Sequence, residues 1–288
     1  MKSYISLPMF VYNDKLNHFL LKFIKKNPQS KKIDFEIEGG FGSFSYDSWN
    51  GDVNSNFGDL QMNKDFYNIS VNFGFPQKYD CSNIFLEETD FYDVHGNIFL
   101  KQAENGSNQI ELCDLAFLNE LQKKYPQYSY ILSKNADIIN EFTPEIIDLF
   151  TEQDSFSAIN LPCYYNNNIE FLKKIKNKSK IELTIGAKCK LCEKEKIKEC
   201  LIAENKNQIL FNNYSVYNNC KLQNNYEDYE EIVETILKLN KLGYSHFRID
   251  APGSFYIKKF NLYLIYSLIK NEYIKDFFKE YIKEGNSL

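Results

Sequence analysis

Four cysteines in the second half of the chain have the residue type and the spacing to hold a metal. They are Cys189, Cys192, Cys200 and Cys220, and they follow the pattern C-x2-C-x7-C-x19-C. Four thiolates bind Zn²⁺ tetrahedrally or hold an iron–sulfur cluster. The second CxxC pair of a zinc ribbon is missing, and no histidine lies between the first and the last cysteine. The irregular spacing therefore favours a 4Fe-4S cluster, with zinc and unrelated thiols as the alternatives.

The composition favours thiols over disulfides. The first residues, "MKSYISLPMF", lack the apolar core and the cleavage site of a secretory signal, so we expect a cytoplasmic protein. Disulfides are rare in a reducing compartment, and an odd total of 7 cysteines would leave one unpaired. No apolar run reaches the roughly 20 residues of a membrane span. The net charge is −5 and no long block of lysine is uninterrupted, so a strong nucleic-acid patch is not expected.

Strand patterns and helix patterns alternate along the chain and predict how these residues are positioned. The expected strands are 4–8, 32–40, 83–91, 108–114, 128–136, 156–162, 180–187 and 244–252. Eight strands interleaved with helices over about 250 residues predict an α/β fold, a single-domain (β/α)8 TIM-like barrel over residues 1–288. An open doubly wound sheet is the alternative. The four cysteines then lie in a metal- or cluster-binding insertion, residues 188–227, between the seventh and eighth strands.

Charged residues line one face of three expected strands, because side chains alternate along a strand with period two. These residues are His246, Arg248 and Asp250 in the eighth strand, Asp34, Glu36 and Glu38 in the second, and Glu182, with Thr184, in the seventh. In a closed barrel the apolar face packs against the outer helices, so the polar face lines the interior.

Buried charge is tolerated only when it is paired. We therefore expect Arg248, the only arginine in the chain, to form ion pairs with interior carboxylates such as Glu36 or Glu182. The planar guanidinium suits a substrate carboxylate equally well, so a structural ion-pair network and a substrate-binding role are both open. The candidate catalytic residues are Arg248, Asp250, His246, Glu36 and Glu182.

The carboxyl ends of barrel strands carry function, and several reactive residues fall there. They are Cys113, Asp114, Lys134, Asn135 and Cys163. After the second strand comes "GGFGSFSYDSWNGD" (39–52), which contains the only tryptophan. This segment is either a loop packed by its own aromatics or a loop that folds over the barrel mouth. In the second case the candidate substrate-binding residues are Trp49, Asn50, Ser43 and Asp47.

The segment "AINLPCYYNNNIEFLKKIKNKSKIELTIGAKCKLC", the four cysteines and the closing "YSHFRIDAP" resemble the collagenase-like peptidase family over about residues 128–255. That family includes iron–sulfur proteins of oxygen-independent ubiquinone hydroxylation and proteins needed to hydroxylate bases in RNA. The resemblance implies a barrel with a 4Fe-4S cluster held by the four cysteines. The cysteine intervals are shorter here than in the better known members, so Cys163 is an alternative ligand. The sequence "APGS" also replaces the Gly-Arg that usually follows the acidic residue.

Three functions remain open. The first is an iron–sulfur barrel enzyme, or a subunit acting with a related partner subunit, that assists oxygen-independent hydroxylation or a related redox modification of a small ring or nucleobase substrate. The second is a peptidase-like hydrolase; HExxH and GxSxG are absent, so His246 would pair with Cys189 or Cys163. The third is a non-enzymatic binding module fastened by zinc. Iron, sulfide and zinc content separates the first from the third.

Overall fold

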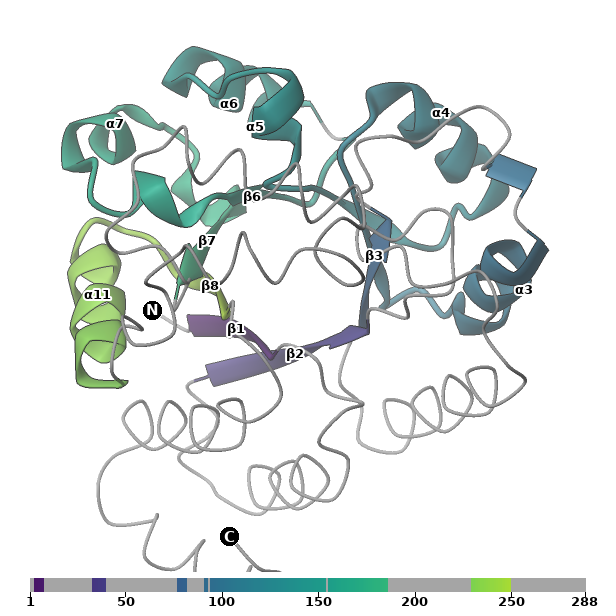
Figure 1. Cartoon of the computed structure of the whole chain (residues 1–288), viewed down its shortest axis with the longest axis horizontal. Helices are drawn as coiled ribbons and strands as arrows, with labels where there is room; N and C mark the ends of the chain where they lie inside the picture. Colours follow the sequence, from purple (N-terminus) through teal and green to yellow (C-terminus); the bar gives the residue numbers. More distant parts are fainter. Residues whose placement is uncertain are drawn as a thin grey trace, which may run out of the picture.

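The computed structural model describes residues 3–7, 33–39, 77–81, 91–92, 94–153, 155–185 and 229–249. Its strands are β1 (Ser3–Leu7), β2 (Ile33–Gly39), β3 (Gln77–Cys81), β4 (Gln109–Leu112), β5 (Ser129–Leu132), β6 (Ala158–Leu161), β7 (Ile181–Ile185) and β8 (His246–Ile249). Within these ranges each strand pairs in parallel with the next one in sequence, and β8 pairs in parallel with β1. The described sheet therefore curls round and closes on itself (Figure 1).

Helices lie outside the sheet (Figure 1). They are α3 (Val94–Ala103), α4 (Leu115–Lys124), α5 (Ala136–Ile139), α6 (Pro144–Glu152), α7 (Ile169–Lys174) and α11 (Tyr229–Lys241), with short 3₁₀ turns η4 (Cys163–Tyr165) and η5 (Lys178–Lys180). Their apolar faces meet the outward residues of the strands. On the strands Ile110, Leu183 and Phe247 are fully buried, as are Ile147 of α6 and Leu172 of α7. A parallel sheet covered by helices is the expected arrangement for strands this apolar on their outer face.

Local signals fix where two of these helices begin and where one ends. The Asp114 carboxylate accepts a hydrogen bond from the Ala116 N–H at 2.7 Å and so caps α4. The Thr143 hydroxyl oxygen accepts one from the Ile146 N–H at 3.2 Å, and Pro144 occupies the first turn of α6. After α11 the chain turns through Gly243 at φ 98°, a left-handed conformation that favours glycine.

The parallel α/β organisation predicted from the sequence is confirmed, and it is compatible with a TIM-like fold. The position of the third strand was wrong. It was expected over residues 83–91, but β3 is Gln77–Cys81, and Phe91 lies in a helical turn. The reason is composition: β3 is short and carries Lys78 and Asp80, so it lacks the apolar run that was sought. Residues 82–90, the expected insertion 188–227 and residues 40–52 of the glycine-rich loop lie outside the described residues.

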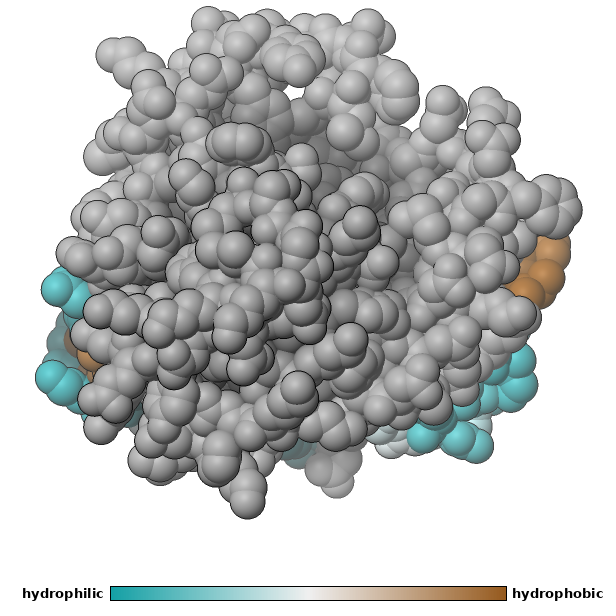
Figure 2. Space-filling view, turned by 90° about the horizontal axis from the view of Figure 1, so that it is seen from below, coloured by the Kyte–Doolittle hydropathy of each residue, from teal (hydrophilic) through white to brown (hydrophobic). Residues whose placement is uncertain are grey.

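The described surface offers no extended apolar face. Its exposed large hydrophobic residues are Tyr92, Val94, Ile98, Leu115, Ile139, Leu149 and Leu237. In Figure 2 the coloured surface at the sides of the molecule is mostly hydrophilic, with small hydrophobic areas at its edges. Scattered exposure of this kind is normal for globular proteins.

Candidate active site in the barrel interior

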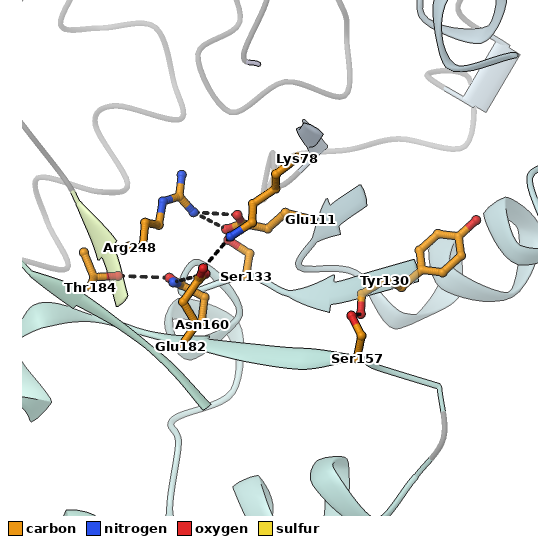
Figure 3. A network of polar contacts seen from close by, with 9 residues as sticks. All are labelled: Lys78, Glu111, Tyr130, Ser133, Ser157, Asn160, Glu182, Thr184 and Arg248. Carbon is orange, nitrogen blue, oxygen red and sulfur yellow. Dashed lines mark hydrogen bonds and ion pairs between the residues drawn. The ribbon is translucent and has the colours of Figure 1, made fainter. Parts of the chain in front are cut away.

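Two buried ion pairs cross the interior of the described barrel (Figure 3). Arg248 of β8 donates through Nη1 to both carboxylate oxygens of Glu111 on β4, at 2.6 and 2.5 Å. Lys78 of β3 donates through Nζ to Oε1 of Glu182 on β7, at 2.5 Å. The four residues are between 1% and 8% exposed, so each charge depends on its partner for solvation.

Neutral side chains complete the network around the two carboxylates. The Ser133 hydroxyl, just after β5, donates to Glu111 Oε1 at 2.7 Å. Asn160 of β6 donates through Nδ2 to Glu182 Oε2 at 2.7 Å, and its Oδ1 accepts from the Thr184 hydroxyl at 3.0 Å. Both oxygens of Glu182 are therefore engaged. These contacts indicate that Glu182 holds Lys78 in place and does not act as a proton acceptor.

The ion pair with Arg248 keeps Glu111 ionised. Burial by itself raises the pKa of Glu111, but the positive charges of Arg248 and Lys78 and the Ser133 hydrogen bond outweigh it. The pKa of Glu111 consequently lies below its ordinary value. A carboxylate that stays charged throughout the physiological range fixes the guanidinium in one orientation.

His246, on the same strand as Arg248, is a titratable group whose environment favours the neutral form. It is the first residue of β8 and stands in register with Glu182 on β7. Burial lowers the pKa of His246 most; the charge of Glu182 opposes that effect and the charge of Lys78 adds to it. The net pKa lies below the ordinary value. A neutral imidazole can accept a proton at neutral pH, so His246 has the chemistry of a general base.

The interior placement predicted for Arg248, Glu182 and Thr184 agrees with these contacts, and Arg248 forms the predicted ion pair with an interior carboxylate, although the partner is one that the sequence did not indicate. Arg248 contacts the carboxylate of Glu111 on β4, while Glu182 contacts Lys78. Sequence reasoning missed both partners. Glu111 alternates with Ile110 and Leu112 in "QIELC", a pattern that could have marked it as inward-facing. Lys78 escaped notice because the third strand was misplaced.

Glu36 belongs to β2, where the register alone is informative. It pairs with Ser6 of β1, and Ser6 pairs with Arg248 of β8. Glu36 therefore stands two strands from Arg248 at the same level of the sheet. Its ion pair with Arg248 stays a prediction. Asp250, the loop residues Ser43, Asp47, Trp49 and Asn50, and the four cysteines lie outside the described residues.

At the carboxyl ends of β4, β5 and β6 the predicted residues have different surroundings. Cys113 is buried, and the Asp114 carboxylate caps α4. Asn135 is buried at the start of α5, and Cys163 is half-buried in η4. Lys134 contributes its positive charge to the low pKa of Glu111. Of these residues, Lys134 is thus electrostatically coupled to the ion-pair network.

A buried carboxylate joins the connections that follow β5 and β6. Asp137 of α5 is fully buried and accepts hydrogen bonds from the Tyr164 hydroxyl, from the Tyr165 hydroxyl at 2.8 Å and from the Phe142 N–H at 2.6 Å. Burial and the Asp137 charge raise the pKa of both tyrosines, so their hydroxyls stay protonated as donors. This Asp137 clamp holds η4 against α5.

The described residues contain no group of three or more His, Cys, Asp or Glu side chains placed to bind one metal ion. The four cysteines of the predicted site lie outside these residues. Within the same ranges, no helix is both long enough and apolar enough to cross a membrane.

Comparisons with known proteins leave the family of this chain open. No family model matches the chain, and no curated protein does. Among solved structures, a U32 peptidase aligns over 88% of this chain and 94% of its own, with a TM-score of 0.49 and 13% identity. A candidate sugar phosphate isomerase/epimerase from Anabaena variabilis aligns over 99% and 98%, with a TM-score of 0.30 and 10% identity. Likenesses at this level assign no activity.

Proposed function

We propose that this chain is an iron–sulfur barrel enzyme, or a subunit of one, that assists an oxygen-independent hydroxylation or a related redox modification of a ring or nucleobase substrate. One observation carries the proposal. Strand β7 bears Glu182 and Thr184 of the interior network and ends at Ile185, and the segment with Cys189 and Cys192 follows directly. In the sequence these thiols come shortly after the carboxyl end of a strand whose side chains belong to the charged interior, and barrel enzymes place their chemistry at the carboxyl ends of strands.

The donor set fits the proposed cluster in its chemistry. Four thiolates in one segment are the ligands of a 4Fe-4S cluster, and they would be Cys189, Cys192, Cys200 and Cys220. When bound, such a cluster accepts and donates single electrons.

The chain's own residues would bind the substrate and move the proton. Arg248, held by ionised Glu111, would orient an acceptor group of the substrate, since an ordered guanidinium loses little freedom on binding. Neutral His246 would take up the proton that the modified ring releases. Glu182 would keep Lys78 charged and in place. Trp49 and its neighbours Ser43, Asp47 and Asn50 would stack on and bind the ring from the glycine-rich loop.

We also propose the wider organisation that this function requires. The whole chain would form one (β/α)8 domain, with residues 188–227 as the cluster-binding insertion between β7 and β8. A related partner subunit would supply or receive electrons, and the protein would work in the cytoplasm, where thiolate-bound iron persists.

Metal analysis tests the proposal. Protein purified anaerobically is expected to be brown and to contain iron and sulfide, and Cys189→Ser or Cys220→Ser should remove the iron. Cys113→Ala is the matched control, because this thiol is buried beside β4 and should leave the iron content unchanged. Cys163→Ser decides whether Cys163 replaces one of the four. Stoichiometric zinc without iron would instead support the zinc-fastened binding module and refute the cluster.

A further inference from the structure

Asn166 is held rigidly where the connection after β6 meets β7. Its Nδ2 donates to the Thr184 carbonyl at 2.7 Å, and its backbone N–H donates to the Cys163 carbonyl at 3.0 Å. The preceding residue, Tyr165, is fixed by hydrogen bonds to Asp137 at 2.8 Å and to the Phe142 carbonyl at 3.0 Å. The side chain of Asn166 therefore has little freedom to turn.

The other end of this amide is an acceptor, the oxygen Oδ1. Asn166 is 8% exposed, and in the described part of the chain its Oδ1 is enclosed and receives no hydrogen bond. Reversing the amide would not help, because Oδ1 would then face the Thr184 carbonyl oxygen. Buried acceptors without a partner are uncommon and cost stability, so one held this firmly calls for a donor that arrives from outside.

Asn166 adjoins the interior network through a single residue. Thr184, whose carbonyl it binds, donates its hydroxyl to Asn160, and Asn160 contacts Glu182. On the same turn Cys163 and Tyr164 are only half-buried, so the turn lies between the interior of the barrel and its surface. This is the carboxyl end of the strands, where barrel proteins bind their ligands.

We propose that Asn166 Oδ1 accepts a hydrogen bond from a ring N–H or amino group of the substrate. The inference rests on the proposed function, in which the substrate is a ring. It adds that the edge of the ring with the N–H or amino donor faces the turn after β6. An ionised carboxylate or phosphate offers only hydrogen-bond acceptors. Its oxygens would repel Oδ1, so such a group would not bind at this position.

A pair of matched probes tests this inference without knowledge of the natural substrate. Uracil carries two ring N–H donors, and 1,3-dimethyluracil keeps the ring but has none. Anaerobically purified wild-type protein, followed by ligand-observed NMR titration, should bind uracil at least about tenfold more tightly than the dimethyl compound. Asn166→Leu, of similar size, should abolish that preference. Tyr165→Phe loosens the same turn without touching Oδ1 and is the control for a purely structural effect.

Two results would overturn the inference. One is wild-type protein that binds neither probe up to about 10 mM, or binds both equally. The other is an Asn166→Leu protein that keeps the preference, in which case Oδ1 is satisfied by an ordered water only. Iron content, measured on the same samples, separates this failure from failure of the proposed function: iron with no uracil preference refutes the role of Asn166 alone.

Discussion

Removing the charge of Arg248 should destabilise the protein far more than removing the whole ion pair. In Arg248→Met the Glu111 carboxylate stays 1% exposed and loses the guanidinium that contacts both its oxygens at 2.6 and 2.5 Å. Breaking a buried pair on one side costs about 3–5 kcal/mol. Because both residues are almost fully buried, we expect the upper part of this range.

The double variant Arg248→Met/Glu111→Gln removes both charges of this pair together and should recover about half of that loss. The four proteins of the cycle are compared by urea unfolding followed by circular dichroism. With a slope of about 3 kcal/mol per M, the single variants should unfold at roughly 1.5 M less urea than wild type. If the two single losses simply add in the double variant, the pair carries no coupling and the reasoning is refuted.

Two further predictions follow from the ion-pair network, one from the Asp137 clamp and one from the turn after α11. The pKa of Glu111 is lowered from 4.5, so its contribution to the free energy of unfolding is complete above pH 4.5 and is lost as the pH falls through the lower pKa of the folded state. Glu111→Gln should therefore make the stability depend less on pH in the acidic range. An unchanged loss of stability at acidic pH would contradict this. Lys78→Met removes a positive charge that lowers the pKa of His246, so NMR titration should show a higher pKa for His246. A lower pKa would show that the charge of Lys78 does not act on His246 in this way. Asp137→Asn weakens a clamp of three donors and should cost about 2–3 kcal/mol in thermal unfolding, more than Tyr164→Phe. Gly243→Ala should cost about 1–2 kcal/mol from its φ of 98°, since the added methyl meets Lys178 only at 3.5 Å; a neutral change would show that this turn relaxes.

The sequence was most informative where local patterns decide the structure. Period-two alternation placed Arg248 and Glu182 in the interior, because a strand has no choice of face once its apolar side is buried. The same rule could have identified Glu111, because it is the polar residue between the apolar Ile110 and Leu112 in "QIELC". β3 could not be found in this way, since its five residues "QKYDC" owe their strand conformation to the pairing with β2 and β4 and not to an apolar pattern.

The residues that meet across the barrel could not be predicted from local sequence patterns. Which carboxylate meets Arg248 depends on which strands stand opposite each other, and that is a property of the closed sheet. Asp137 likewise belongs to "NADII", where nothing distinguishes it from a surface carboxylate. Only the approach of Tyr164 and Tyr165 from the next connection makes it a buried acceptor.

The closure of the sheet by β8 against β1 has a consequence for synthesis of the protein. Ser6 and Arg248 pair at this seam, and Arg248 meets Glu111 across a separation of 137 residues. During translation the first seven strands therefore emerge with an open edge and with Glu111 lacking the guanidinium of Arg248. Contacts this distant in sequence form late, because the loop they close must be ordered first. A ribosome-bound chain ending before β8 should consequently expose an unpaired strand edge, making it a natural client for chaperones until the last strand arrives.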